Sequence, residues 1–356
     1  MTRGSLLWHM GGLALLALSA RTDVPGQHAS DEALAAAFLQ DMAEKSSQAT
    51  GTVVVGKNGW LFFVPELRHL GVGQFWGDAA RRVSRALDPN DADPLPAILD
   101  FQAQLKKAGI VLVFVPVPAK AIVYPEMISD RLKMTGGRPP RLDVHHQAFY
   151  RLLAERGVEV LDLTGEFLDR RAGAQDNLYC QQDTHWSGLA CYVAAEAIAA
   201  RIRPKVEPVA PSVTGRYTAK PLVVEITGDL WRDLVGPRPP REKLQVLQVG
   251  LDTPDGWRPV EPWRQSPVLL LGDSHDLVFH GGDDMHAKSA GLADHLALHL
   301  GFPVDLVAVR GSGATPSRVN LLRRADNLAG KKIVVWCMSV REFTEGSGWK
   351  KVPVVK

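Results

Sequence analysis

From about residue 95 onward, helix-like segments alternate with short runs of consecutive apolar residues. The predicted helices cover 95–108, 144–156, 189–202, 290–300 and 317–329. The predicted strands cover 110–117, 158–163, 268–271, 304–309 and 333–336. A strand that is apolar at almost every position is typical of a parallel sheet buried on both faces. The alternation therefore predicts an α/β fold in which helices cover both faces of a mostly parallel sheet.

Other parts of the chain depart from this alternation. Residues 31–45 predict an amphipathic helix, and residues 53–64 predict a β-hairpin. Asn58-Gly59 would form its turn, because these two residues tolerate positive φ angles. Between about 204 and 266 the helical pattern disappears, proline becomes frequent and short β-prone stretches appear. We interpret this part as a β-rich insertion in the α/β core.

The first residues have the layout of an export signal. Arg3 precedes a largely apolar run over 6–20 that closes with the small residues Ser19 and Ala20. This order is typical of a secretory signal peptide. Leu18 is larger than the residue usually found three positions before a cleavage site, so an uncleaved membrane anchor is the alternative. Either reading predicts that the rest of the chain is exported.

Composition excludes some classes of protein. The chain has 356 residues, of which 46% are hydrophobic and 22% are charged, as in a globular protein and unlike a disordered one. The formal net charge is +2, and lysine and arginine are scattered along the chain. Nucleic-acid binding favours a concentrated basic patch, so no nucleic-acid partner is predicted.

Three cysteines are too few for a disulfide scaffold, and none has the Cys-x-x-Cys spacing of a metal site. Cys180 and Cys191 flank the segment Asp183-Thr184-His185. A disulfide bracing that segment and two separate thiols are both open at this stage. Cys337 lies in an apolar run and is interpreted as a small buried residue.

The first candidate for chemistry is Gly272-Asp273-Ser274, which follows the apolar strand at 268–271. Ligands of open α/β sheets bind beyond the carboxyl ends of the strands. A serine at that edge can expose its Oγ as a nucleophile while backbone N–H groups face a developing oxyanion. The alternative is an ordinary turn, since all three residue types favour turns.

The second candidate is Asp183-Thr184-His185-Trp186. A serine needs a general base, and histidine supplies one with a pKa near neutrality. A carboxylate on the second ring nitrogen fixes the tautomer and stabilises the imidazolium. The alternative is structural: Asp183 or Ser187 would cap the following helix, and His185 would only pack.

Other histidines give weaker candidates. His275 is a rival base by proximity to Ser274, although adjacent residues in such a turn usually point apart. His295 and His299 have the i, i+4 spacing of some metal sites, but the stretch fits an ordinary helix face and lacks the glutamate of a His-Glu-x-x-His motif. No metal site is predicted.

Taken together, the two blocks resemble the alginate O-acetyltransferase family of the AlgJ and AlgX type. Its Asp-x-His-Trp and Gly-Asp-Ser patterns match Asp183–Trp186 and Gly272–Ser274, and its early Gly-x-x-Gly-Trp-Leu-Phe pattern matches Gly56–Phe62. Weaker matches are Pro118-Ala119-Lys120 with Tyr124-Pro125, Gly228-Asp229-Leu230, and Val334-Val335-Trp336 leading to Arg341. The Asp/His block precedes the serine, the reverse of ordinary SGNH esterases and the order of this family.

The resemblance implies an SGNH-hydrolase-like, three-layer α/β/α domain with permuted catalytic blocks. It implies that Ser274 takes an acetyl group and passes it to a hydroxyl of an exported polysaccharide in the periplasm. His185 would act as base and then acid, and Asp183 would orient it. A membrane-bound O-acyltransferase partner would supply the acetyl group, and no diffusible cofactor would be needed.

The oxyanion hole is less defined by the sequence. By resemblance to the second block of SGNH enzymes, the backbone N–H groups of Gly313 and Ser274 would be its donors; the alternative is that Gly311 and Gly313 only form a turn. The third block of SGNH enzymes, Gly-x-Asn-Asp, is replaced here by the segment from Trp336 to Glu342, so the asparagine donor is absent. Arg341 is therefore a candidate substitute or sugar ligand; the alternative is a salt-bridged surface residue. Lys120 and Tyr124 are further candidates for lining the cleft, and the alternative for both is an ordinary exposed loop residue.

Three readings of function remain open on the sequence. The acetyltransferase is the first; an acetylesterase with the same triad and a non-catalytic polysaccharide-export scaffold are the alternatives. The expected organisation is a signal or anchor over 1–20, a helical segment over 21–50, the catalytic domain with its insertion over 51–345, and a tail over 346–356.

Overall fold

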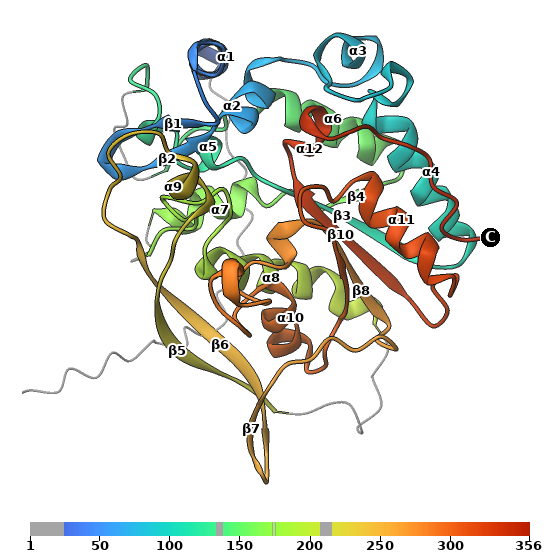
Figure 1. The fold of residues 1–356 in the computed structure, drawn as a ribbon. Coiled ribbons are helices and arrows are strands. Elements are labelled where there is room, and N and C mark those ends of the chain that lie inside the picture. Colours follow the sequence, from blue (N-terminus) through green and yellow to red (C-terminus); the bar gives the residue numbers. More distant parts are fainter. Residues whose placement is uncertain (1–24, 133–137, 173, 175, 207–215) are drawn as a thin grey trace, which may run out of the picture.

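The centre of the molecule is a five-stranded parallel sheet (Figure 1). The computed structural model describes residues 25–132, 138–172, 174, 176–206 and 216–356; the predicted export signal lies outside them. The strands are β3 (Val111–Val117), β4 (Glu159–Val160), β8 (Val268–Gly272), β9 (Asp305–Ala308) and β10 (Ile333–Ser339). Their order is β4-β3-β10-β8-β9, and every neighbouring pair is parallel. Strand β10, the last in the chain, therefore lies between β3 and β8.

Helices pack on both faces of the sheet, as the alternating pattern predicts. The helices are α1 (Pro25–Gln48), α2 (Val64–Gly71), α3 (Ala80–Val83), α4 (Pro94–Lys107), α5 (Lys120–Val123), α6 (Val144–Glu155), α7 (Thr164–Arg171), α8 (Gly188–Ile202), α9 (Asp229–Asp233), α10 (Leu292–Leu300), α11 (Thr315–Arg324) and α12 (Glu342–Glu345). Within the described residues, no helix combines the length and the apolar character that a membrane crossing requires.

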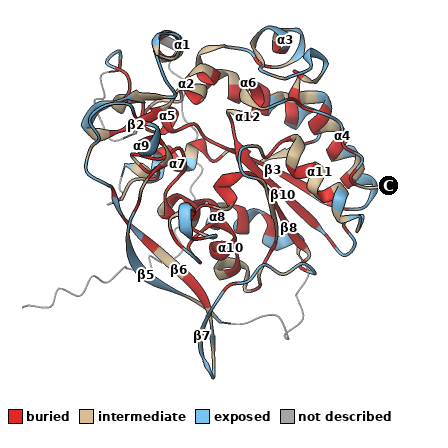
Figure 2. Ribbon diagram, viewed as in Figure 1, coloured by how far each residue is buried: buried red, intermediate tan, exposed pale blue. Residues whose placement is uncertain are grey.

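Trp336 of β10 shows which helices share a face. Its ring lies 5.3 Å from that of Phe101 in α4 and 5.1 Å from the guanidinium of Arg318 in α11. Successive side chains of a strand point to opposite faces, so Cys337 points the other way. Helices α8 and α10 lie on that second side (Figure 1). The three central strands β3, β10 and β8 are buried along nearly their whole length (Figure 2).

The predicted hairpin is confirmed. Strands β1 (Val53–Val55) and β2 (Leu61–Phe63) pair antiparallel, and Asn58 and Gly59 between them have φ angles of 53° and 81°. The amide of Leu61 donates a hydrogen bond to the carbonyl of Gln181, 2.8 Å away. The hairpin is therefore attached to the segment that carries Asp183 and His185.

The segment between α8 and β8 forms a second sheet. Its antiparallel strands are β5 (Tyr217–Glu225), β6 (Lys243–Thr253) and β7 (Gly256–Pro259). Val246 of β6 lies against Gly188 at the start of α8, and Val249 packs with Ala297 of α10. Strand β5 and the tip of β7 are largely exposed (Figure 2). One side of the second sheet thus covers α8 and α10.

Several boundaries differ from the predicted ones for identifiable reasons. The strand predicted over 158–163 is only Glu159–Val160, because the chain turns soon after it: the Asp162 carboxylate accepts the Thr164 N–H at 2.9 Å, and α7 begins at Thr164. The helix predicted over 317–329 ends at Arg324, because Ala325 adopts a left-handed conformation with φ 52°. All three cysteines are buried and free, so Cys180 and Cys191 form no disulfide.

Candidate active site

The candidate residues gather at the carboxyl ends of the parallel strands. Ser274 follows β8, Gly313 follows β9 and Arg341 follows β10. The segment carrying Asp183 and His185 precedes α8 and reaches the same edge. This is the edge at which open α/β sheets bind ligands.

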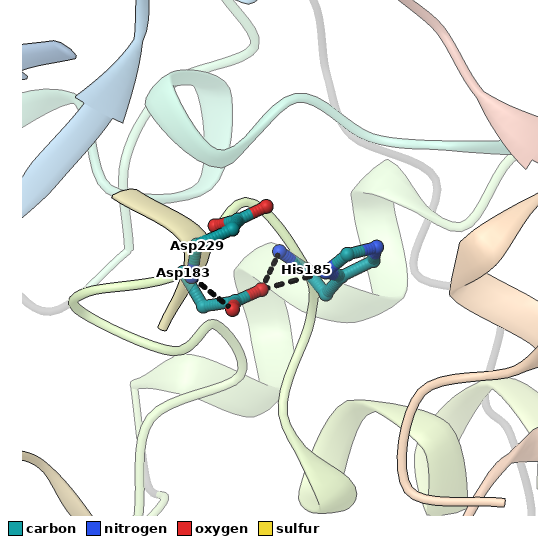
Figure 3. Close-up of side chains that lie close together, drawn as sticks. All are labelled: Asp183, His185 and Asp229. Carbon is teal, nitrogen blue, oxygen red and sulfur yellow. Dashed lines mark hydrogen bonds and ion pairs between the residues drawn. The ribbon is translucent and has the colours of Figure 1, made fainter. Parts of the chain in front are cut away.

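Ser274, His185 and Asp183 form a continuous hydrogen-bonded chain. His185 Nε2 lies 2.8 Å from Ser274 Oγ, and His185 Nδ1 lies 2.6 Å from Asp183 Oδ1. Figure 3 shows the Asp183 carboxylate meeting the His185 ring. Ser274 is 6% exposed and His185 8% exposed, so both residues are almost completely shielded from solvent.

The backbone around Ser274 explains why Gly-Asp precedes it. A Cβ on Gly272 would lie 1.8 Å from the carbonyl oxygen of Cys337, so only glycine lets β8 approach β10 this closely. The buried Asp273 carboxylate accepts the N–H groups of His275 at 2.8 Å and Ser339 at 2.9 Å. These contacts hold the turn and leave Ser274 at its apex.

Trp186 and Ser187 place His185. The Trp186 ring is fully buried, and its Nε1–H donates to the carbonyl of His275 at 3.0 Å. The Ser187 hydroxyl accepts the Ala190 N–H and caps α8, whereas the Asp183 carboxylate is used elsewhere. The Asp-x-His-Trp block is therefore anchored beside the residue that follows the serine.

Each oxygen of the Asp183 carboxylate accepts two hydrogen bonds. Oδ1 accepts the backbone N–H of His185 at 3.0 Å in addition to its Nδ1. Oδ2 accepts the backbone N–H of Asp229 at 2.8 Å and Nε2 of His286 at 3.0 Å. Figure 3 shows Asp229 beside Asp183. The carboxylate is fully satisfied and held in one orientation.

Asp229 also holds the other side of the segment. Its carboxylate accepts the backbone N–H of Thr184 at 2.8 Å and the Thr184 hydroxyl at 2.6 Å. A Cβ on Gly228 would lie 2.0 Å from the carbonyl oxygen of Gln182, which explains the glycine before Asp229. The triplet Gly228-Asp229-Leu230 was the sequence signal for this residue, although its role was not predicted. For His286 the sequence held no signal beyond a histidine-rich stretch.

The surroundings of Asp183 and His185 shift the pKa values of both side chains. Burial raises the pKa of Asp183, but His185 and His286 overcome that effect and hold the pKa of Asp183 well below its usual range. Burial lowers the pKa of His185, but the Asp183 carboxylate outweighs it and raises the pKa of His185 above 6.5. Burial and the Asp183 charge raise the pKa of Asp229. An ionised Asp183 beside a basic His185 is the charge pattern of a general-base pair.

The rival base, His275, is occupied elsewhere. Its Nδ1 lies 3.0 Å from Asp273 Oδ1, and it is fully enclosed. Burial lowers the pKa of His275 to about 4. Among the described residues, His185 is the histidine whose ring nitrogen contacts Ser274 Oγ.

Gly313 lies against the backbone of Asp273, next to the serine. Its carbonyl accepts Trp336 Nε1–H at 2.9 Å, which fixes the peptide. The Ser312 hydroxyl donates to the buried Glu342 carboxylate at 2.5 Å, and burial together with the Asp273 charge raises the pKa of Glu342 to about 7. Within the described part of the chain, neither the Ser274 nor the Gly313 N–H has an acceptor.

Arg341 lies at the rim of the same edge. Its side chain is partly buried, donates to Ser339 Oγ at 3.0 Å and stacks 5.6 Å above the Phe63 ring. Its charge is close enough to influence the pKa values of His185 and Asp273. Arg341 therefore lies near Ser274 and His185 and contributes a positive charge to their surroundings.

Lys120 and Tyr124 lie beneath the site and do not line its surface. The Lys120 ammonium is buried and donates to three backbone carbonyls: Leu61 at 2.6 Å, Gln181 at 2.9 Å and Asp183 at 3.1 Å. The Tyr124 hydroxyl accepts the Leu178 N–H at 2.8 Å, and its ring packs on Trp60. Both side chains are used in holding the hairpin and the Asp183 segment.

We expect Lys120→Met to destabilise the protein and to reduce activity. The substitution removes one donor from each of three carbonyls, of which Gln181 keeps the Leu61 N–H, and the loss costs about 2 kcal/mol or more of unfolding free energy. The Asp183 backbone then shifts, and a displacement of about 1 Å lowers kcat on the order of 10²-fold. Denaturant unfolding and kinetics below the unfolding transition measure the two effects.

Lys331 provides the matched control for Lys120. It is also buried, and its ammonium donates to the carbonyl of Ser266 at 2.8 Å and contacts Asp305 at 2.8 Å, at the amino end of β10. Lys331→Met should lose similar stability and keep kcat. Equal losses of kcat in the two variants would show that Lys120 has no particular link to the site.

One ligand atom each of Asp183, His185 and Asp229 lies within 4.8 Å of the others, close enough to hold a cation. Asp183 and His185 already use those atoms in hydrogen bonds to each other and to their neighbours. The arrangement fits an acid–base chain better than a metal centre, because a bound ion would displace the contacts that orient His185.

The comparisons with known proteins agree with this geometry. A family model described as "SGNH hydrolase-like domain, acetyltransferase AlgX" matches residues 53–340. Two relatives are described as probable alginate O-acetylase AlgJ. The one from Pseudomonas aeruginosa is 31% identical over 154 residues, and the one from Azotobacter vinelandii is 29% identical over 153 residues. These alignments cover 42% and 43% of this chain but 33% and 34% of the relatives, so the chain spans about one third of their length.

Two solved structures are similar in fold. The O-acetyltransferase domain of Pseudomonas putida AlgJ has a TM-score of 0.60 at 23% identity, over 82% of this chain and 92% of that one. Pseudomonas aeruginosa AlgX has a TM-score of 0.57 at 17% identity, over 81% of this chain and 62% of that one. The predicted SGNH-hydrolase-like fold is confirmed.

Proposed function

The chain belongs to the SGNH hydrolase-like AlgX acetyltransferase family, and from this premise we propose that it is a polysaccharide O-acetyltransferase using Ser274 as nucleophile. The observation that carries the proposal is the unbroken chain from Asp183 through His185 to Ser274, with contacts of 2.6 Å and 2.8 Å. A serine, a base and an orienting carboxylate in this geometry are the parts of acyl transfer through a covalent intermediate.

The first half-reaction transfers the acetyl group to the protein. Ser274 Oγ attacks the carbonyl carbon of the donor ester as its proton passes to His185 Nε2. The tetrahedral intermediate collapses, the bond to the donor oxygen breaks, and His185 returns the proton to that oxygen. The ionised Asp183 stabilises the imidazolium that exists between these two transfers.

In the second half-reaction a sugar hydroxyl replaces the donor. It gives its proton to His185 and attacks the acetyl carbonyl, and the bond to Ser274 Oγ breaks as the serine recovers its proton. The Ser274 and Gly313 N–H groups, which lack acceptors among the described residues, would bind the oxyanion of both intermediates. Arg341, beside the triad, would contact the donor or the acceptor in place of the absent asparagine.

The acceptor would be an exported polysaccharide, of which alginate is the model suggested by the names of the relatives. The reaction would take place in the periplasm, with a membrane-bound O-acyltransferase as the source of acetyl groups. No diffusible acyl carrier is needed in this scheme, because the acetyl group passes between two esters.

Incubation with an aryl acetate donor, with and without a polysaccharide, tests the proposal. We expect acetyl esters to appear on the polymer and the aryl alcohol to be released faster when an acceptor is present. Alginate, cellulose and a neutral galactan in parallel reactions identify the preferred class. Release of acetate at one rate, whatever polymer is added, would establish an esterase. Absence of donor cleavage with every polymer would favour a scaffold.

A further inference from the structure

A second histidine, His286, contacts the triad aspartate from the side opposite His185. His286 Nε2 lies 3.0 Å from Asp183 Oδ2, whereas His185 uses Oδ1. The His286 side chain is 4% exposed, and its ring packs 5.5 Å from that of Phe279. His286 is distant in sequence from Asp183 and enters the site from the segment between Ser274 and α10.

The segment that carries His286 has an unusual backbone. Phe279, Asp283, His286 and Ser289 have φ angles of 61°, 52°, 74° and 62°. They make up four of the eight non-glycine residues with positive φ in the described part of the chain. Side chains other than glycine rarely adopt this conformation, and such strain concentrates where function requires a particular geometry.

Hydrogen bonds across the segment hold that geometry. The N–H of Phe279 donates to the Met285 carbonyl at 2.8 Å, and the N–H of Gly282 donates to the Ala287 carbonyl at 2.8 Å. The loop is also attached to a neighbouring segment, because the Asp284 carboxylate accepts two hydrogen bonds from Arg310 at 2.7 Å and 2.9 Å. His286 is thus held on a closed loop that is tied to the strand end leading to Gly313.

We propose that His286 is a positioning residue of the acetyl-transfer reaction, which donates its Nε2–H to Asp183 and fixes the carboxylate against His185. The proposal rests on the proposed function. Among the described residues, the hydrogen bond of the His286 ring goes to Asp183 and not to Ser274 or His185, so His286 acts through Asp183. If His286 is removed, Asp183 Oδ2 loses one donor and the carboxylate can rotate away from His185 Nδ1. The imidazole can then turn, and its hydrogen bond to Ser274 Oγ is lost.

The two nitrogens of His286 allow a sharp test. Glutamine places its amide nitrogen near the position of Nε2, and asparagine places it near that of Nδ1. Because the contact uses Nε2, His286→Gln should restore most of what His286→Leu loses, and His286→Asn should not. We expect kcat of the Leu and Asn variants to fall about tenfold or more, with KM changed less than about twofold.

His280 provides a control on the same segment. Its Nδ1 pairs with the buried Asp294 at 3.0 Å, away from the triad, so His280→Leu removes a comparable buried pair. We expect His280→Leu to lower the melting temperature and to leave kcat unchanged. If His286→Leu does not fold, the comparison of the Gln and Asn variants decides.

Two results would overturn the assignment of His286. One is a wild-type kcat in His286→Leu or His286→Asn, and the other is equal kcat in the Gln and Asn variants. Ser274→Ala separates this inference from the proposed function. An active Ser274→Ala removes the proposed function, whereas an inactive Ser274→Ala beside a fully active His286→Leu removes only the role of His286.

Discussion

Ser274→Ala is expected to lower kcat for acetyl transfer by about 10⁴- to 10⁶-fold, because it removes the atom to which the acetyl group is attached. Within the described part of the chain, the Ser274 side chain makes one hydrogen bond, to His185 Nε2 at 2.8 Å, and none to an element of the surrounding fold. The free energy of unfolding should therefore change by no more than about 1 kcal/mol. Residual turnover would reflect the oxyanion donors and substrate binding alone.

The measurement combines steady-state kinetics with mass spectrometry of the protein after exposure to the acetyl donor. Wild type should carry one acetyl group on Ser274, and the alanine variant none. Ser129→Ala serves as control, since the buried Ser129 hydroxyl donates to Asp41 of α1 at 2.5 Å and not to a residue of the proposed triad. Full activity in Ser274→Ala would reject the serine as the nucleophile.

Asp183→Asn is expected to lower kcat by about 10⁴-fold, because it disturbs both the charge and the tautomer of His185. Each carboxylate oxygen of Asp183 faces two N–H donors. An asparagine must turn its NH₂ group toward one of these pairs. If the NH₂ faces His185, the imidazole must offer a lone pair at Nδ1, and Nε2 then carries the proton and cannot accept one from Ser274.

The pH profile shows whether the Asp183 charge sets the base. In wild type the pKa of His185 is raised above 6.5 by Asp183. The base works when neutral, so kcat/KM should fall as pH drops through a value above 6.5. Without the carboxylate, burial dominates and lowers the pKa of His185, so the acid limb of Asp183→Asn should move to lower pH. An unchanged limb would show that another group titrates.

Asp294→Asn is the matched control for this substitution. Asp294 is a fully buried carboxylate that pairs with His280 and accepts the Gly291 N–H at 2.9 Å. Its amide variant should lose stability and retain both kcat and the acid limb. A comparable loss of kcat there would mean that the effect in Asp183→Asn arises from general damage to the fold.

Much of the architecture could be predicted from local pattern. Runs such as 110–117 and 268–271 are apolar at almost every position because the strands they form are covered on both faces. Boundaries were less predictable, as the short β4 and the early end of α11 show. Those ends depend on a side chain that accepts a backbone N–H and on a left-handed residue, which hydrophobic periodicity does not report.

Some residues of the candidate site can likewise be predicted from local sequence, whereas the role of others depends on tertiary contacts. Ser274, His185 and Asp183 stand in short blocks whose residue types carry a chemical meaning, so the sequence predicts them as candidates. The sequence also gives Lys120 as a candidate, but for lining the cleft. Its place beneath the Asp183 segment depends on three carbonyls from two distant parts of the chain.

The sequence by itself determined the parallel sheet, the order of the two candidate blocks and the candidate residues Asp183, His185 and Ser274, because these reside in local pattern and residue chemistry. Tertiary structure alone decided that His185, and not the adjacent His275, meets Ser274. It also decided that Asp229 and His286 hold the second oxygen of Asp183. Such contacts arise when strand ends and loops far apart in the chain converge at one sheet edge, and no spacing along the chain records that convergence.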